Sequence, residues 1–244
     1  MLQDLHSHTY YSFCGKDTPE AVVEAAIAGG IELLGITDHC HGIGNARLDV
    51  FYSQSESIAR GYGRTLRRYF DHINLVKEKY RDKITVLRGI ELTLTDNGAR
   101  TAFPLGEDIS YFDYCLIENP DLSLTTDIFE YREAVGIRMG IAHTDLFSYA
   151  RAKKIDPYVL FCRMAKADIF WEMNVSYDSI HGYREHPYML SFFADTEAQV
   201  AVRESGLSLS VGFDGHRVED YLPDRIKDYC RRIGEMGIKL AFEP

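Results

Sequence analysis

Short apolar runs alternate along the chain with longer stretches in which apolar residues recur at helical spacing. This alternation is typical of βα units arranged around a parallel sheet, and the chain contains about seven such units. The pattern predicts strands at Leu2–His8, Leu33–Thr37, Thr85–Leu92, Tyr114–Ile117, Met139–His143, Phe170–Val175 and Leu207–Asp214, with a further edge run at Lys239–Phe242.

Local signals mark several of the helices between these strands. Thr18-Pro19-Glu20 combines a capping hydroxyl, a proline at the first helical position and an acid near the positive end of the helix dipole, and Gly29-Gly30 marks the helix end. Helical spacing predicts a second helix over about Arg64–Tyr80. A third helix near the C-terminus is predicted to bury Ile226, Tyr229, Cys230 and Ile233.

The length of 244 residues suits one α/β barrel, and no linker rich in Pro, Gly or Ser divides the chain. We therefore predict a single domain over residues 1–244. In parallel barrels the loops after the strands carry the active site, so we expect His41–Gly63 and Tyr177–Tyr188 to form its walls.

The charge balance excludes some classes of partner. The chain has 27 Lys and Arg against 37 Asp and Glu, a net charge of −10, whereas extended nucleic-acid or anionic-membrane surfaces need a positive field. A small phosphorylated substrate stays possible, because arginines and bound cations can reverse the sign locally. The chain lacks a membrane-spanning run and a signal-peptide pattern, and its five cysteines have no CxxC spacing, so we expect a cytoplasmic protein.

Residue types that bind metals follow the ends of five predicted strands. His6 and His8 end the first strand, and a spacing of two directs both imidazoles to one face. Any one such residue could be a hydrogen-bonded core group or a strand-end cap, but clustered imidazoles and carboxylates repel or stay unsatisfied unless a cation collects them. The sequence therefore predicts a site for several metal ions. Besides His6 and His8, the metal-binding residue types at these strand ends are Asp38, His39, Glu91, His143, Asp214 and His216.

The ordered motifs HSH (6–8), TDH (37–39), GIE (89–91), AHTD (142–145) and DGH (214–216) resemble those of the PHP (polymerase and histidinol phosphatase) metallohydrolases. The resemblance covers nearly the whole chain, and finer matches at residues 79–91, 172–176, 183–184 and 214–220 point to the histidinol-phosphatase branch. It implies a distorted seven-stranded (β/α)7 TIM-like barrel with two or three divalent metal ions in its mouth. Zinc is favoured, and manganese and iron(II) are the alternatives.

The resemblance also implies a set of ligands. His6, His8, Glu91 and Asp214 would hold one ion, Glu91 would bridge to a second ion held with His143, and His39 and His216 would hold a third. Cys14 stands where the family usually has histidine or aspartate; it is either a thiolate ligand, which favours zinc, or a small buried residue. The family also has a histidine after the fourth strand, for which Glu118 or Asn119 could substitute.

The resemblance further implies a metal-dependent phosphoric monoester hydrolase acting on a small phosphorylated metabolite such as histidinol phosphate, in histidine biosynthesis. The nucleophile would be a metal-activated hydroxide, formed from a metal-bridging water held by Glu91 and Asp214. No GxSxG motif supports a covalent route, and no residue stands out as the general acid. Arg184 and Arg217 are predicted to bind phosphate, the alternative being exposed arginines paired with an acid such as Glu185 or Glu219.

Two other functions stay open. An amidohydrolase-type enzyme that cuts C–N or C–O bonds also begins with HxH, but that class has a lone aspartate where this chain has both Asp214 and His216. An accessory or low-turnover module of the kind attached to DNA polymerases is disfavoured by the negative charge and by the nearly complete ligand set.

Overall fold

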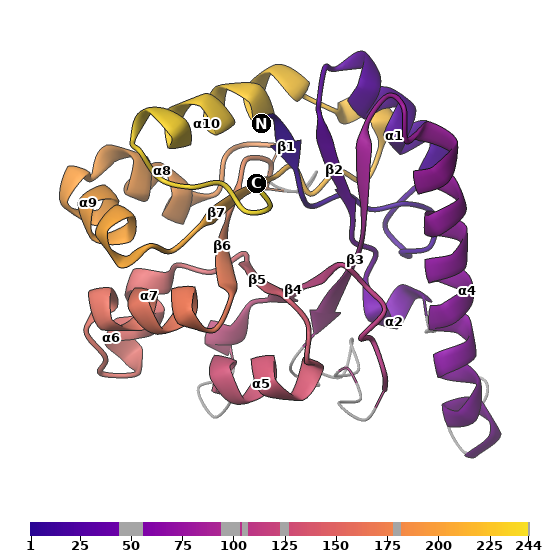
Figure 1. Ribbon diagram of the computed structural model, residues 1–244, viewed down its shortest axis with the longest axis horizontal. Coiled ribbons are helices and arrows are strands. Elements are labelled where there is room, and N and C mark those ends of the chain that lie inside the picture. Colours follow the sequence, from indigo (N-terminus) through magenta and orange to yellow (C-terminus); the bar gives the residue numbers. More distant parts are fainter. Residues whose placement is uncertain (44–55, 94–102, 104–106, 123–126, 178–181, 244) are drawn as a thin grey trace.

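The computed structural model describes residues 1–43, 56–93, 103, 107–122, 127–177 and 182–243, with the backbone alone at 41, 42, 56–63 and 122. Seven parallel strands follow one another in chain order around a nearly closed barrel (Figure 1). Each strand pairs with the next one in sequence, as expected for repeated βα units, so the predicted TIM-like α/β barrel is confirmed. The strands are β1 (Gln3–Asp4), β2 (Leu33–Ile36), β3 (Thr85–Thr93), β4 (Tyr114–Glu118), β5 (Met139–Ala142), β6 (Ile169–Asn174) and β7 (Leu209–Gly212).

The barrel closes between β1 and β7 through isolated bonds. The Leu5 N–H donates to the Val211 carbonyl at 2.9 Å, and the Asp214 N–H donates to the His6 carbonyl at 2.7 Å. A single parallel bridge joins Ser7 to Gly215. The first strand is therefore shorter than the predicted Leu2–His8, because beyond Asp4 the backbone makes single bridges and no continuous ladder.

Helices lie on the outer side of the strands (Figure 1). Thr18 caps the first helix as predicted, its hydroxyl accepting the Ala21 N–H at 3.2 Å, and the last helix buries the four predicted residues. The long second helix begins at Glu56 and not near Arg64. The helices are α1 (Pro19–Ala28), α2 (Cys40–Ile43), α4 (Glu56–Tyr80), α5 (Ile128–Val135), α6 (Leu146–Ala152), α7 (Pro157–Lys166), α8 (Pro187–Ala194), α9 (Thr196–Ser205) and α10 (Pro223–Glu235), with 3₁₀ turns η1 (Pro120–Leu122) and η3 (Val218–Asp220).

Side-chain alternation along the strands separates two apolar layers. The larger layer lies between strands and helices and includes Trp171 and Phe161, whose rings stack. The smaller layer contains Leu87 and Phe170, which precede Glu91 and Glu172 in the same strands by four and two residues. Because an even spacing keeps side chains on one face of a strand, each strand carries an apolar residue and then an acid on the same face.

The C-terminal segment packs against the smaller apolar layer. The predicted edge run Lys239–Phe242 forms one bridge, between Leu240 and Leu209, and no named strand. Ala241 is fully buried, and the Phe242 ring packs against Tyr114 and Phe170 with centroids 5.3 and 5.9 Å apart. This segment therefore covers the apolar layer that precedes the acids along the strands.

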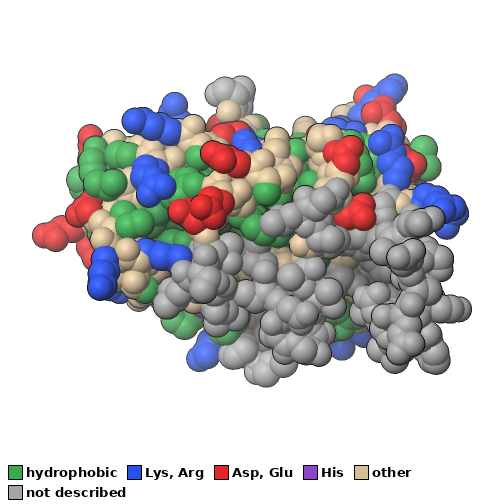
Figure 2. All heavy atoms as spheres, turned by 90° about the horizontal axis from the view of Figure 1, so that it is seen from below, with side chains coloured by type: hydrophobic (Ala, Val, Ile, Leu, Met, Phe, Trp, Pro, Cys, Tyr) green, Lys and Arg blue, Asp and Glu red, His purple; other side chains and the backbone are tan. Residues whose placement is uncertain are grey.

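The described part of the chain contains no helix long and apolar enough to cross a membrane. On the face drawn in Figure 2, the acidic and basic side chains of the described residues are interspersed. Neither sign of charge gathers there into an extended patch among these residues.

Candidate metal centre

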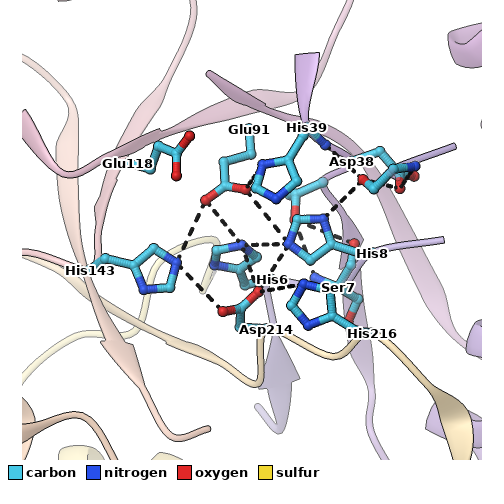
Figure 3. Close-up of polar contacts among 12 residues, drawn as sticks. His6, Ser7, His8, Asp38, His39, Glu91, Glu118, His143, Asp214 and His216 are labelled. Carbon is cyan, nitrogen blue, oxygen red and sulfur yellow. Dashed lines mark hydrogen bonds and ion pairs between the residues drawn. The ribbon is translucent and has the colours of Figure 1, made fainter. Parts of the chain in front are cut away.

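Seven of the eight predicted metal ligands meet at the carboxyl ends of the strands (Figure 3). They come from the ends of β1, β2, β3, β5 and β7, which the barrel brings to one side. Their donor atoms form four overlapping groups, each with its atoms within 4.8 Å of one another. The groups are His6–His8–Glu91, His6–His143–Asp214, His8–His39–His216 and His39–Glu91–Glu118.

Glu91 lies at the centre of this cluster and is fully buried. Its Oε1 lies 3.3 Å from His6 Nε2 and 3.7 Å from His143 Nε2, and its Oε2 lies 2.6 Å from His39 Nδ1 and 3.6 Å from His8 Nε2. Among the described residues neither oxygen has a hydrogen-bond donor in regular geometry. A buried carboxylate whose lone pairs are not filled by donors is costly, and a divalent cation removes that cost. The donor set around Glu91 therefore fits a metal ion.

The electrostatics of the cluster point the same way. Burial alone would raise the pKa of Glu91, but the imidazoles of His39 and His6 outweigh it and hold that pKa well below its usual range. Asp214 is affected likewise: burial would raise its pKa, and His6 together with the close contact to His8 lowers it well below its usual value. Burial would lower the pKa of His6, whereas Glu172 and Glu91 raise it well above normal. The acids and imidazoles of the cluster thus stabilise one another's charged forms, and a divalent cation could take the place of the imidazole protons.

Glu172 orients His6 from outside the cluster. Its Oε1 lies 2.6 Å from His6 Nδ1, which leaves Nε2 to face Glu91 and Asp214. Carboxylates commonly fix metal-binding imidazoles in this way. Gly212 is required for the contact, because a Cβ there would lie 2.1 Å from Glu172 Oε1 and 2.7 Å from His6 Cβ.

Two of the cluster residues have a left-handed backbone. His143 has φ of 53° and Asp214 has φ of 56°, a region that non-glycine residues seldom occupy. Both follow the last residues of their strands, where this conformation turns the chain away from the strand direction. Strain of this kind persists when surrounding structure fixes it, and it is common at functional sites.

Cys14 lies beside the cluster, at the edge formed by His39 and His216. Burial alone would raise the pKa of the Cys14 thiol, but hydrogen bonds with His216 and His39 lower it to about 7. Together with the His8–His39–His216 group, this places a potential thiolate next to three imidazoles. Its role as a ligand stays a prediction.

The acid proposed as a substitute after the fourth strand also reaches the cluster. Glu118 joins the group with His39 and Glu91, and its Oε1 accepts a hydrogen bond from the Thr93 hydroxyl. The next residue, Asn119, has a left-handed backbone with φ of 48°. Glu118, one of the two predicted substitutes, is therefore placed within reach of the cluster.

The two predicted phosphate-binding arginines are exposed. Arg217 forms an ion pair with Glu219 at 3.2 Å. This pairing is the alternative to phosphate binding that the sequence left open for Arg217. Arg184 is held by its backbone in a bridge with Tyr177, whereas Glu185 pairs with Arg225 at 3.9 Å. Most of the predicted wall His41–Gly63, and residues 178–181 of the other, lie outside the described residues.

Sequence reasoning missed the role of two acids. Asp38 precedes His39 and is a potential ligand by its position in the sequence, but its carboxyl group bonds to Thr9 and Ser12, away from the cluster (Figure 3). In the sequence Glu172 belongs to the matched segment 172–176 without a role of its own, although a lone acid in the fully buried strand β6 is itself a signal of a specific partner.

The sequence matches the PHP domain family over residues 4–236. The chain belongs to the PHP domain family. No curated protein matches it. Among solved structures, it resembles the histidinol phosphate phosphatase of Lactococcus lactis in complex with zinc, L-histidinol and phosphate, with a TM-score of 0.61 and 19% identity over 98% of this chain and 95% of that one.

A second structure, a protein of Listeria monocytogenes described as a histidinol phosphatase, gives a TM-score of 0.52 and 17% identity over 89% of this chain and 96% of that chain. At these identities the two structures show that this PHP chain shares their fold. Membership of the PHP family and the clustered donors together support a metal-dependent hydrolase.

Proposed function

We propose that the protein is a metal-dependent phosphomonoesterase acting on a small phosphorylated metabolite. The observation that carries the proposal is the buried Glu91 carboxylate, which faces imidazoles from three strand ends and has no regular hydrogen-bond donor among the described residues. Such a donor set is suited to several neighbouring cations. When bound, ions of this kind lower the pKa of a water molecule toward neutrality and neutralise phosphoryl oxygens.

The proposed assignment of ligands to ions is the one that the family resemblance implies, and its histidine and acid ligands all lie in the overlapping groups described above. His6, His8, Glu91 and Asp214 would hold one ion, and His143 would hold a second together with Glu91. His39 and His216 would hold a third, with Cys14 beside them as a thiolate ligand. Two or three ions are therefore expected, zinc before manganese or iron(II), because imidazole and thiolate ligands suit zinc.

The proposed substrate is histidinol phosphate, which would place the reaction in histidine biosynthesis, in the cytoplasm. Support comes from the Lactococcus lactis structure, which holds zinc, L-histidinol and phosphate. Arg184 and Arg217 would bind the phosphate, since guanidinium groups match its oxygens in pairs. For Arg217 this requires the exposed pair with Glu219 to open, which costs about 1 kcal/mol or less for exposed ion pairs in general.

The test combines metal analysis of the purified protein with phosphate release from p-nitrophenyl phosphate and histidinol phosphate, with and without added Zn²⁺, Mn²⁺ or Fe²⁺. Two or three metals per chain and metal-dependent phosphate release are the expected results. Metal binding without phosphate release from either ester would overturn the phosphatase proposal. Absence of bound metal under all three additions would overturn the metal centre as well.

A further inference from the structure

The Ser12 hydroxyl connects two of the proposed ligands to a buried acid. Ser12 Oγ lies 2.7 Å from Asp38 Oδ1, 3.2 Å from His8 Nδ1 and 2.9 Å from the backbone nitrogen of His39. Ser12, Asp38, His8 and His39 are all buried, so these contacts are not shared with bulk water. The single hydroxyl proton can therefore go only to Asp38 or to His8, because the His39 N–H is itself a donor.

The Ser12 hydroxyl donates its hydrogen bond to Asp38. Oδ1 of Asp38 also accepts the N–H groups of Thr9 at 2.7 Å and Ser12 at 3.0 Å, and Oδ2 of Asp38 accepts the Thr9 hydroxyl at 2.7 Å. Four donors directed at one carboxyl group are typical of an ionised acceptor. In the opposite arrangement, Ser12 would donate to His8 across the longer contact of 3.2 Å. The shorter contact of 2.7 Å between Ser12 and Asp38 would then have no proton between its two oxygens, unless Asp38 itself were protonated.

The direction of the Ser12 proton determines the tautomer of His8. Once Ser12 donates to Asp38, its oxygen can only accept, and it accepts from the His39 N–H and from His8 Nδ1. His8 Nδ1 must then carry a proton, and Nε2 keeps its lone pair in neutral His8. Nε2 is the atom that lies 3.0 Å from Asp214 Oδ1 and 3.1 Å from His6 Nε2.

We infer that Asp38 and Ser12 are positioning residues that select Nε2 of His8 as its metal-binding atom. The inference rests on the proposed metal centre. The same contacts fix the turn Thr9–Ser12, because Asp38 bonds to both ends of it. Asp38 would thus act on His8 through one hydroxyl, without itself serving as a metal ligand.

The principal variant is Ser12→Ala in the full-length, zinc-loaded protein. The matched control is Ser210→Ala, which removes another buried serine hydroxyl that has no hydrogen-bond partner among the described residues. Nitrogen-15 NMR of the histidine side chains reports which ring nitrogen of His8 carries the proton. Zinc affinity is measured by competition with a chelating dye.

Wild-type protein is expected to show a proton on Nδ1 of His8, protected from solvent exchange. Ser12→Ala should lose this protected signal and bind zinc about 10- to 100-fold more weakly, the usual effect of removing a partner of a metal-binding histidine. Ser210→Ala should change neither readout. Asp38→Asn should keep the Nδ1 proton and weaken zinc binding less than Ser12→Ala, because an amide oxygen at the Oδ1 position still accepts the Ser12 proton.

Two results would overturn the inference while leaving the metal centre intact. One is a wild-type spectrum with the His8 proton on Nε2 or with zinc bound through Nδ1. This measurement uses the wild-type protein alone and so does not depend on whether a variant folds. The other is a folded Ser12→Ala protein with unchanged His8 signals and unchanged zinc affinity. Failure of wild-type protein to bind zinc at all would instead be a failure of the proposed function.

Discussion

At the scale of single residues, the charge of Glu91 matters more than its shape. Glu91→Gln keeps the size of the side chain but removes the negative charge that faces four imidazoles. We expect zinc content to fall and kcat at saturating zinc to drop by about 10²-fold or more, since metal ions contribute several kcal/mol to such reactions. Zinc analysis and phosphate release check this. Glu133→Gln, an exposed acid on α5, is the control, and equal loss in both variants would contradict the assignment.

Gly212 tests the contact between Glu172 and His6 without touching either side chain. Gly212→Ala places a methyl group against both, so we expect a loss of about 1–3 kcal/mol in stability and zinc binding weaker by about 10- to 100-fold. The control is Gly234→Ala, because a Cβ there meets nothing within 4 Å and alanine favours a helix by about 0.5–1 kcal/mol. Chemical unfolding and dye competition measure the two effects, and unchanged zinc binding in Gly212→Ala would count against the orienting role of Glu172.

At the scale of elements, Arg88 and Asp113 tie β3 to the start of β4 and to α4. Arg88 donates to Asp113 through its backbone N–H at 2.8 Å and through two guanidinium contacts of 3.0 and 2.6 Å, and it also donates to Asn74 of α4 at 2.8 Å. Burial alone would raise the pKa of Asp113, but these bonds and Lys77 lower it below its usual value. Its contribution to stability is therefore present above the unfolded pKa and is lost as the pH falls through the lower folded pKa.

Asp113→Asn should accordingly lower the free energy of unfolding by about 1–2 kcal/mol at pH 7, as expected for weakened bonds to a charged group. The difference from wild type should shrink as the pH falls below about 4, where Asp113 becomes protonated in the unfolded chain. Urea unfolding at a series of pH values measures this. A difference that stays constant down to pH 2 would show that the charge of Asp113 does not stabilise the fold.

The elements also show what the sequence could predict. Strand positions and the residues that follow them were readable, because a parallel barrel places all strand ends on one side; hence His6, Glu91, His143 and Asp214 were correctly expected to meet. The partners that orient them were not readable, since Glu172 lies 166 residues from His6 and Asp38 is 26 residues from Ser12. Such contacts depend on register and on side-chain rotation, which periodicity alone does not fix.

At the scale of the whole molecule, the side chains inside the barrel change from apolar to charged along the direction of the strands. Leu87 and Phe170 share an apolar layer with the C-terminal segment, and Glu91 and Glu172 lie further along the same strands. The buried acids and imidazoles are thus gathered on one side of a packed core. Because buried like charges disfavour the folded state, a cation that binds only the folded chain should stabilise the entire domain.

This reasoning predicts that zinc raises the melting temperature in a concentration-dependent way. At a free zinc concentration about 100 times Kd, binding adds about 2.7 kcal/mol, which for a domain of this size shifts Tm by about 5–10 °C. A chelator should reverse the shift, and Glu91→Gln should lose most of it because its central ligand is gone. Differential scanning calorimetry across a zinc series measures both proteins. Equal shifts in wild type and Glu91→Gln would mean that zinc stabilises the fold from another site, since a central ligand cannot be removed without loss of affinity.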